Sequence, residues 1–363
     1  MKLFLFELRK TILIQKGWII ILACLIANPA VLFFFPEQKD SRIQLSQRQY
    51  DIYLEQLIGP ATVEKEIFIY EERDRINSII EQYGIMLSLY ESGEISYDEF
   101  WSFIDEYEDA KLKSSAIGIF YEKVLQFHEL KDFPDLLPPE YFYEYGWKSV
   151  FTYYTFPSVF LLLIAALIGV QSFGSEYVSG MLNILRVTKK GRTSLFASKI
   201  LVILFILVLS AVSSTLGEFY ILNAKGWLNN PDIPIYSVAN FTGVPLEISL
   251  FAGLIQIWLI RAVGLFLFGI VISCLSILLK NPVFAFFTGT GIILIPYIIG
   301  LRTPFWFAGF ISGQEVLLRY NYGQGFKYWG LPLMIVCIYT LAVFYAAYFN
   351  FISPSRSKKI IKP

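Results

Sequence analysis

The sequence has very few of the residues that build disulfide frameworks and metal centres. Its 363 residues include three cysteines and one histidine. Cys24, Cys274 and Cys337 each lie inside an apolar run, where a thiol behaves as a small hydrophobic side chain. His128 has no second histidine or cysteine at the spacing of a zinc site. The sequence therefore predicts neither a disulfide-stapled domain nor a metal site.

The motifs of the common nucleotide-binding and hydrolytic enzymes are also missing. There is no G-x-x-x-x-G-K-[ST] phosphate loop, and the nearest basic stretch with a glycine, residues 189–193, has the wrong spacing. Neither H-E-x-x-H nor G-x-S-x-G occurs. Ionisable residues are rare inside the apolar runs, which disfavours a proton or ion path. We expect a chain that is not itself an enzyme, needs no cofactor of its own and binds no nucleic acid.

Hydrophobic side chains, in contrast, are abundant. They make up 55% of the chain, aromatic residues make up 17%, and the mean hydropathy is +0.54. A soluble domain of this length has no interior large enough to bury so much apolar surface. A membrane-spanning helix needs roughly 20 apolar residues, and six runs lack Asp, Glu, Lys and Arg. These runs are 17–36, 149–175, 200–217, 262–279, 281–301 and 328–355. They predict an all-α integral membrane protein with six transmembrane helices.

The distribution of Lys and Arg predicts which segments face the cytoplasm. With the N-terminus inside and six alternating spans, the inner segments hold 14 Lys and Arg in 56 residues, and the outer segments hold 15 in 173. This excess agrees with the positive-inside rule and predicts cytoplasmic N- and C-termini. The first run follows a basic start, as a signal peptide does. The run is long and has no small-x-small cleavage site, so we expect that it is not cleaved. Residues 1–35 then comprise an N-terminal interfacial helix followed by the first span.

Residues 36–152 form the longest segment between two predicted spans and are predicted to be an acidic, helical extracellular domain. They contain 24 Asp and Glu against 11 Lys and Arg. Apolar side chains recur every three or four residues, and Ser96 with Glu99 has the pattern of a helix-capping box. The recurring positions are Ile67, Tyr70, Ile76, Ile79, Ile80, Tyr83, Leu87 and Tyr90. The negative charge either attracts cationic peptides or serves solubility alone.

Residues 153–363 hold the other five predicted spans and one irregular stretch. The apolar part of residues 245–260 is too short to cross a membrane, so we expect an interfacial helix on the outer face, ahead of a span that begins near Arg261. Arg261 lies 19 residues before Lys280, and Glu218 lies 19 residues after Lys199. At about 1.5 Å per residue, Glu218 and Arg261 reach similar depths. Two interpretations follow: an interhelical ion pair, or two side chains that reach the outer headgroups separately.

The cytoplasmic loop 174–199, between the second and third spans, is the most informative segment for function. Val178, Met181, Leu182 and Leu185 fall at i, i+3, i+4 and i+7, which predicts a short helix with one apolar face. A helix joined to two spans in this way can receive a push from a cytoplasmic partner and pass it to the bundle. The alternative interpretation is an ordinary basic loop that lies on anionic lipid.

The order of residues in this loop resembles the ABC exporter permeases, and most closely the ABC type-2 class. Glu176 precedes a small residue and a glycine, a basic turn ends in Arg192, and Lys199 begins a span. Residues 6–10, before the first span, are similar to the interfacial helix of that family. The six-span layout is also similar, so the resemblance covers the topology of the whole chain, while its sequence specificity is concentrated in residues 174–199.

The resemblance implies a permease subunit in a bacterial plasma membrane. It would pair with a second permease chain, identical or not, while separate cytoplasmic ATP-binding subunits bind ATP and Mg²⁺. Carried over, Glu176 and Gly180 would belong to the coupling helix on which those subunits dock, and Arg192 and Lys199 would anchor the loop at the membrane surface. The expected cargo is a peptide or an amphipathic compound. The biological role could then be the export of antimicrobial peptides or self-immunity against them.

One departure from the family keeps a second function open. Residues 36–152 are much longer than the compact first external loop that is common in the class. The alternative is a non-transporting membrane protein, either a sensor or tether or a mechanotransmitting protein, which acts through its extracellular helical domain.

Overall fold

The structure is a computed structural model that describes residues 2–131, 133, 136–178, 189–241, 246–298 and 330–352. It is mostly helical, and the chain divides into two compact units. The first, which we call the helix bundle, comprises Met1–Phe35, Tyr153–Lys225 and Leu254–Pro363. The second, which we call the acidic unit, comprises Pro36–Thr152 and Gly226–Gly253. The segment after the third predicted span therefore folds together with residues 36–152.

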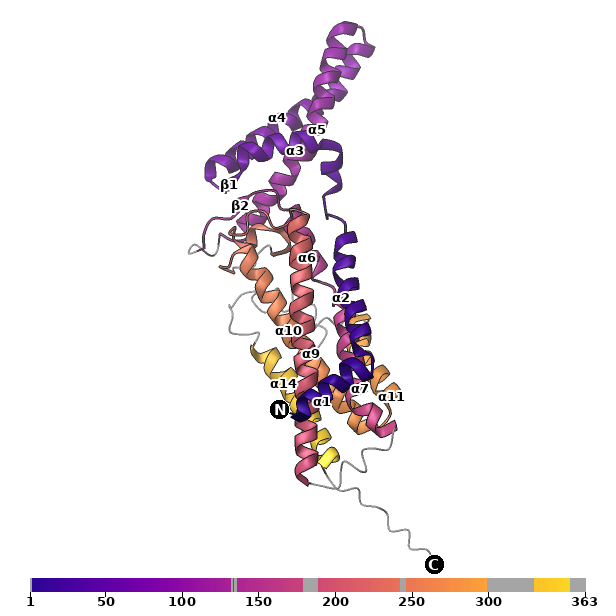
Figure 1. Cartoon of the computed structure of the whole chain (residues 1–363). Coiled ribbons are helices and arrows are strands. Elements are labelled where there is room, and N and C mark those ends of the chain that lie inside the picture. The colour runs from indigo at the N-terminus through magenta and orange to yellow at the C-terminus, as the bar shows by residue number, and fades with distance from the viewer. Residues whose placement is uncertain are drawn as a thin grey trace, which may run out of the picture. The chain divides into compact units, whose positions relative to one another are not determined.

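The helix bundle is built from apolar helices and a short turn of π-helix near the N-terminus (Figure 1). Its elements are α1 (Lys2–Arg9), the π-helix η1 (Lys10–Ile14), α2 (Gly17–Phe34), α7 (Val159–Val178), α9 (Lys189–Ala224), most of α10 (Leu250–Leu279), α11 (Pro282–Ile298) and α14 (Gly330–Ile352).

Five helices within the described residues are long and apolar enough to cross a membrane: α2, α7, α9, α10 and α14. This agrees with the prediction of an all-α membrane protein. The remaining expected span, the run 281–301, corresponds to α11, which is shorter, with 17 residues and an internal Pro296. Residues 299–329, which include the rest of that apolar run, lie outside the described part of the chain.

The second span begins later than its apolar run. Helix α6 (Tyr145–Tyr153) ends inside the run 149–175, and α7 starts only at Val159. Pro157 lies in the non-helical connection, and a proline inside a helix removes a backbone donor and clashes with the preceding turn. The run is therefore divided between two helices, and the apolar pattern alone did not reveal the break.

Residues 245–260 do not form the separate interfacial helix that the sequence suggested. Helix α10 runs without interruption from Leu250 to Leu279, which is 30 residues or about 45 Å. The interpretation failed because it treated Arg261 as the boundary of a span. Arg261 is 6% exposed, and its guanidinium lies 3.1 Å from the carboxylate of Glu218. A paired arginine can continue inside an apolar helix.

Small residues bring the helices of the bundle close together. A Cβ atom at Gly169 of α7 would lie 2.6 Å from Ile272 Cγ2 of α10, and one at Gly269 of α10 would collide with Leu207 of α9. Close backbone approach at glycine is typical of packed membrane helices. The shared core includes Ile164, Ala165, Ile168, Ile206, Leu207, Phe268 and Ile272.

The acidic unit is also mostly helical in its described residues, and it contains an antiparallel ladder of two residues per strand and an isolated bridge between Pro234 and Ser249. Its elements are α3 (Ser41–Leu57), β1 (Gly59–Pro60), α4 (Val63–Glu91), α5 (Tyr97–His128), β2 (Glu140–Tyr141), α6, and the 3-10 turns η2 (Ile235–Ser237) and η3 (Ala239–Phe241). Helices α4 and α5 run side by side as a long hairpin (Figure 1). Ser96 and Glu99 form the predicted capping box at the start of α5.

The core of the acidic unit differs in detail from the predicted apolar stripe. Ile69 and Ile76 are the fully buried residues of α4, whereas Ile67 is 49% exposed. They pack with Tyr50 of α3 and Phe120 of α5, and those two rings stack at 5.1 Å. The periodicity gave the helix correctly, but it did not fix which face turns toward α3 and α5.

Candidate functional site

A buried cluster of four charged side chains joins three helices and the π-helix near the N-terminus. We call it the Lys199 cluster; it consists of Glu7, Lys10, Glu176 and Lys199. The Lys199 ammonium lies 2.8 Å from Glu7 Oε2 and 2.7 Å from Glu176 Oε1. Lys10 Nζ lies 3.0 Å from Glu176 Oε1. Two cations and two anions therefore alternate, and their formal charges cancel.

The side chains of this cluster are buried, whereas the charged side chains of an ordinary basic loop on anionic lipid would be exposed. The side chains of Lys199, Glu176 and Glu7 are 2%, 3% and 5% exposed, and only Lys10 reaches 20%. Lys199 also donates a hydrogen bond to the carbonyl of Ser172 at 2.8 Å. Charges removed from water to this degree are tolerated only when they are paired and hydrogen-bonded. The cluster therefore holds α1, η1, α7 and α9 in one arrangement.

The chain leading into α2 fixes the position of the N-terminal helix. The π-helix η1 ends at Ile14, and Lys16 has the left-handed backbone conformation, with φ of 54°. A Cβ at Gly17 would lie only 2.6 Å from the carbonyl oxygen of Thr11, so this turn needs a glycine. Gln15 Nε2 donates to Ser175 Oγ of α7 at 3.0 Å. These contacts tie the N-terminal segment to the same end of α7 that carries Glu176.

The predicted coupling residues fall partly inside the described chain. Glu176 lies in the last turn of α7 as part of the Lys199 cluster, and Val178 is the last residue of that helix. Gly180, Met181, Leu182 and Leu185 lie outside the described residues. The predicted amphipathic helix of the loop thus remains a prediction.

The two basic residues expected to anchor the loop have different environments. Arg192 lies in the first turn of α9, and its guanidinium donates to the carbonyl of Ile352 in α14. Lys199 lies farther along α9 and is buried between two glutamates, instead of facing the membrane surface. The sequence showed a lysine at the start of an apolar run, but it did not show that Glu7 and Glu176 would both reach it.

A second polar cluster surrounds Glu218 elsewhere in the bundle. We call it the Glu218 cluster; its members come from α2, the connection 154–158, α9 and α10. They are Asn28, Tyr154, Ser158, Ser214, Glu218, Trp258 and Arg261. Arg261 Nη1 lies 3.1 Å from Glu218 Oε2, so the structure pairs the two residues that the depth argument brought together.

Glu218 is surrounded by donors. Tyr154 donates to its Oε2 at 2.7 Å, and Asn28 donates to its Oε1 at 2.5 Å. The Arg261 guanidinium also lies 4.7 Å from the centre of the Tyr154 ring. Trp258 Nε1 in turn donates to the Tyr154 hydroxyl at 2.8 Å. The carboxylate oxygens of Glu218 therefore have hydrogen-bond donors and a cation as partners inside the bundle.

Sequence reasoning found the charged pair of this cluster but missed its neutral members. Asn28 interrupts the first apolar run and is 2% exposed. Its side chain donates to Ser214 at 2.7 Å and accepts from Ser158 at 2.5 Å. A polar amide inside a predicted span was the available signal, because such residues mark contacts between membrane helices. Tyr154 gave no comparable signal.

Both clusters are suited to holding helices together, and neither has the composition of a metal centre. Within the described residues, no group of three or more His, Cys, Asp and Glu side chains is placed to bind a metal ion. Comparisons with protein families, curated proteins and solved structures give no significant match.

Proposed function

We propose that the chain is the membrane-spanning permease subunit of an ATP-driven exporter of the ABC type-2 class. The observation that carries the proposal is the position of the Lys199 cluster. Glu176 and Lys199 lie in α7 and α9, the two helices on either side of residues 179–188, and they pair at 2.7 Å. The segment on which a cytoplasmic ATPase is expected to dock is thus flanked by two helices that an ion pair holds together.

In this proposal, the cluster converts a push on the loop into movement of several helices. A force on residues 179–188 reaches α7 and α9 together, because separating them would leave buried charges unpaired. Lys10 and Glu7 extend the link to η1 and α1. The N-terminal segment would then act as an interfacial lever at the cytoplasmic surface. Phosphate-loop chemistry and Mg²⁺ belong to the partner subunit.

The surface of the bundle supports a lipid environment and a second permease chain. Large apolar side chains remain exposed on the long helices. They include Trp18, Leu22, Ile26 and Phe33 of α2, Leu201, Phe205, Leu209 and Leu216 of α9, and Met334, Ile338 and Tyr345 of α14. Such faces are stable against lipid or against another apolar helix. We propose a bacterial plasma membrane, with cytoplasmic termini and the acidic unit outside.

The proposal is tested by co-expressing the chain with a separate phosphate-loop ATPase subunit from the same genome. Leu182→Asp with Leu185→Asp places two charges on the apolar face of the predicted loop helix. We expect these changes to abolish co-purification and stimulation of ATP hydrolysis. The matched control, Asn183→Asp with Val187→Asp, adds the same charge on the opposite face of the predicted helix and should leave both intact.

A second variant separates docking from transmission. Glu176→Gln weakens the Lys199 cluster without touching the apolar face of the loop. Association with the ATPase should persist, while stimulation of ATP hydrolysis by the permease is lost. If the loop variants bind and stimulate the ATPase as the unchanged chain does, the permease proposal is wrong.

The sensor or tether alternative is supported by one observation: the acidic unit has its own core and a long hairpin. The α4–α5 hairpin consists of helices of 29 and 32 residues, joined by a capped turn. If ATP-dependent transport by vesicles fails while ATPase stimulation survives, the chain transmits force instead of moving cargo. That outcome would favour the mechanotransmitting function.

A further inference from the structure

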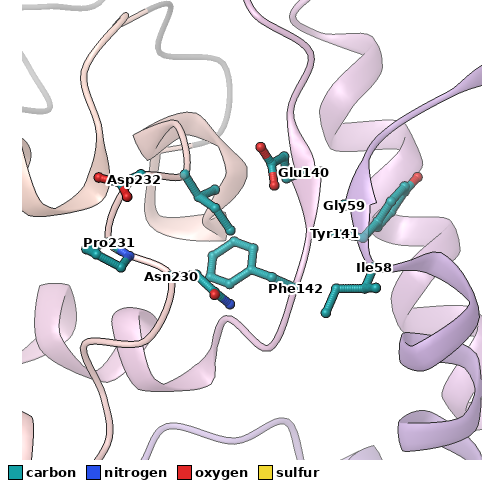
Figure 2. Close-up of a pocket in the computed structure, with 9 residues that line it drawn as sticks. Ile58, Gly59, Glu140, Tyr141, Phe142, Asn230, Pro231 and Asp232 are labelled. Carbon is teal, nitrogen blue, oxygen red and sulfur yellow. The ribbon is translucent and has the colours of Figure 1, made fainter.

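The largest cavity of the acidic unit has carboxylates that solvent can reach. This open cavity, of about 380 Å³, lies beside β1 and β2 and is lined by an exposed Asp232 and a half-buried Glu140 (Figure 2). Its Phe142 ring is 2% exposed and already faces the Lys123 ammonium at 5.2 Å. Because solvent can hydrate both carboxylates, neither of them requires a ligand.

A much smaller cavity in the helix bundle is different, because polar groups that are cut off from solvent line it. This cavity lies between α9 and α10, beside the Glu218 cluster. The space that it leaves open to a water molecule is about 10 Å³, which is about the least that holds one water. Its walls include Leu161 of α7, Ala211, Ser214 and Thr215 of α9, and Trp258 and Arg261 of α10.

The side chain of Arg261 has an unpaired donor at this cavity. Nη1 of the guanidinium lies 3.1 Å from Glu218 Oε2, and the Arg261 side chain as a whole is 7% exposed. Its Nε is buried and forms no hydrogen bond with the described residues. A buried N–H group without an acceptor is costly in an apolar interior. The position therefore requires an acceptor small enough for the cavity.

Two hydroxyl groups of α9 can complete the hydrogen bonding of such an acceptor. Thr290 of α11 donates to the carbonyl of Phe286, in the preceding turn of its own helix, at 2.8 Å. The Thr215 hydroxyl, in contrast, forms no hydrogen bond with the described residues. The neighbouring Ser214 hydroxyl accepts one hydrogen bond and donates another within the Glu218 cluster, which leaves a lone pair on its oxygen.

We propose that this cavity binds one structural water molecule, which bridges α9 and α10. The water accepts from Arg261 Nε and donates to Thr215 Oγ1 and Ser214 Oγ. Buried waters in proteins typically have about three polar partners. An ion fits less well, because Glu218 and Arg261 neutralise each other and leave no net charge to attract it. This inference does not depend on the proposed export function.

The test is X-ray radiolytic labelling of the full chain in nanodiscs, read by mass spectrometry. Irradiated water yields hydroxyl radicals, which oxidise the side chains next to it. Trp258 lines the cavity, whereas Phe205 of α9 is 47% exposed on the surface of the bundle. After correction for intrinsic reactivity, Trp258 should be labelled at least about tenfold faster than Phe205, because the lipid tails around Phe205 hold no water.

Two variants with matched controls remove the water in different ways. Ala211→Val fills the cavity with its added methyl groups and should slow the labelling of Trp258 by about fivefold. Its control, Ala197→Val, makes the same change at an exposed position of α9 and should alter the rate by less than about twofold.

The second variant keeps the volume of the side chain, so it also guards against misfolding of the first. Thr215→Val removes one partner of the water and should slow the labelling of Trp258 by about threefold. Its control, Thr290→Val, removes a hydroxyl that already bonds within α11 and should alter the rate by less than about twofold.

Three results would overturn the proposal. Labelling of Trp258 as slow as that of Phe205 would mean that the cavity is dry. Unchanged labelling of Trp258 in both cavity variants would place the reactive water elsewhere. Equal slowing in the control variants would mean that the substitutions act on the bundle as a whole. Because no ATPase is present, each result is independent of the outcome for the loop variants.

Discussion

The two buried clusters of the helix bundle neutralise charge in different ways. The Lys199 cluster sets two lysines against two glutamates, so every polar contact among its four side chains joins opposite charges. The Glu218 cluster has one charged pair surrounded by an amide, an indole and hydroxyl groups. Neutral groups of this kind can donate or accept, except for the indole, whereas a lysine only donates and an ionised glutamate only accepts.

This difference determines in which cluster the charged residues can be exchanged. In the Lys199 cluster every side chain pairs with one of opposite charge, so only the present placement of lysines and glutamates satisfies all four. The Glu218 cluster depends on having its donors and acceptors satisfied, and its amide and hydroxyls can reverse direction. A rigid link and an adaptable link therefore lie in the same helix bundle, and α9 contributes to both.

Removal of the central lysine should have the largest effect. Lys199→Met removes the lysine that pairs with Glu7 and one of the two lysines that pair with Glu176. Breaking a buried pair from one side costs about 3–5 kcal/mol, because an uncompensated charge stays buried. Steric trapping or SDS unfolding in bicelles measures the loss. A loss below about 1 kcal/mol, typical of exposed pairs, would show that water reaches the cluster.

Exchanging the charges tests the comparison directly. Glu218→Arg with Arg261→Glu should recover about 1–3 kcal/mol relative to the sum of the single changes, because Asn28 and Tyr154 can turn to suit the reversed pair. The same exchange at Glu176 and Lys199 should recover much less.

The reason for this contrast lies with the residues that stay in place. After the second exchange, Lys10 would face a lysine and Glu7 would face a glutamate. A full double-mutant cycle at each pair gives the two coupling free energies. Equal recovery at both pairs would remove the distinction between the clusters.

The smallest effect is expected from a neutral member. Tyr154→Phe removes the hydroxyl that donates to Glu218 at 2.7 Å and accepts from Trp258 at 2.8 Å. Hydrogen bonds between membrane helices contribute about 0.6 kcal/mol on average, with a maximum near 1.7. The loss, measured by the same unfolding assay, should lie in that range. A loss as large as that of Lys199→Met would mean that Tyr154 is essential to the ionised pair.

Much of the architecture could be predicted from the sequence because it depends on local pattern. Apolar runs gave the long helices, and Ser96 with Glu99 gave the start of α5. The Glu218–Arg261 contact was accessible because depth along two antiparallel spans follows from residue counts. Each of these inferences needs only a local residue pattern, or residue counts along neighbouring spans with the rise per residue.

The remaining features depend on contacts between distant segments. Glu7 and Lys199 are separated by 192 positions, and nothing local shows that α1 folds onto α9. The same holds for residues 226–253, which join the acidic unit. The predicted span boundary at Arg261 was wrong because an arginine was taken to mark the end of a membrane helix. The ion pair with Glu218 allows Arg261 to lie inside α10, and that pairing forms only in the folded chain.

The turn between α4 and α5 offers a way to determine topology on intact cells. Gly93 has φ of 78°, and the short connection is closed by the capping box of α5. The buried part of α4 lies around Ile69 and Ile76, so an epitope inserted after Gly93 leaves that core undisturbed. Antibody labelling without permeabilisation would place the acidic unit on the cell exterior. Labelling that needs permeabilisation would reverse the assignment of every segment.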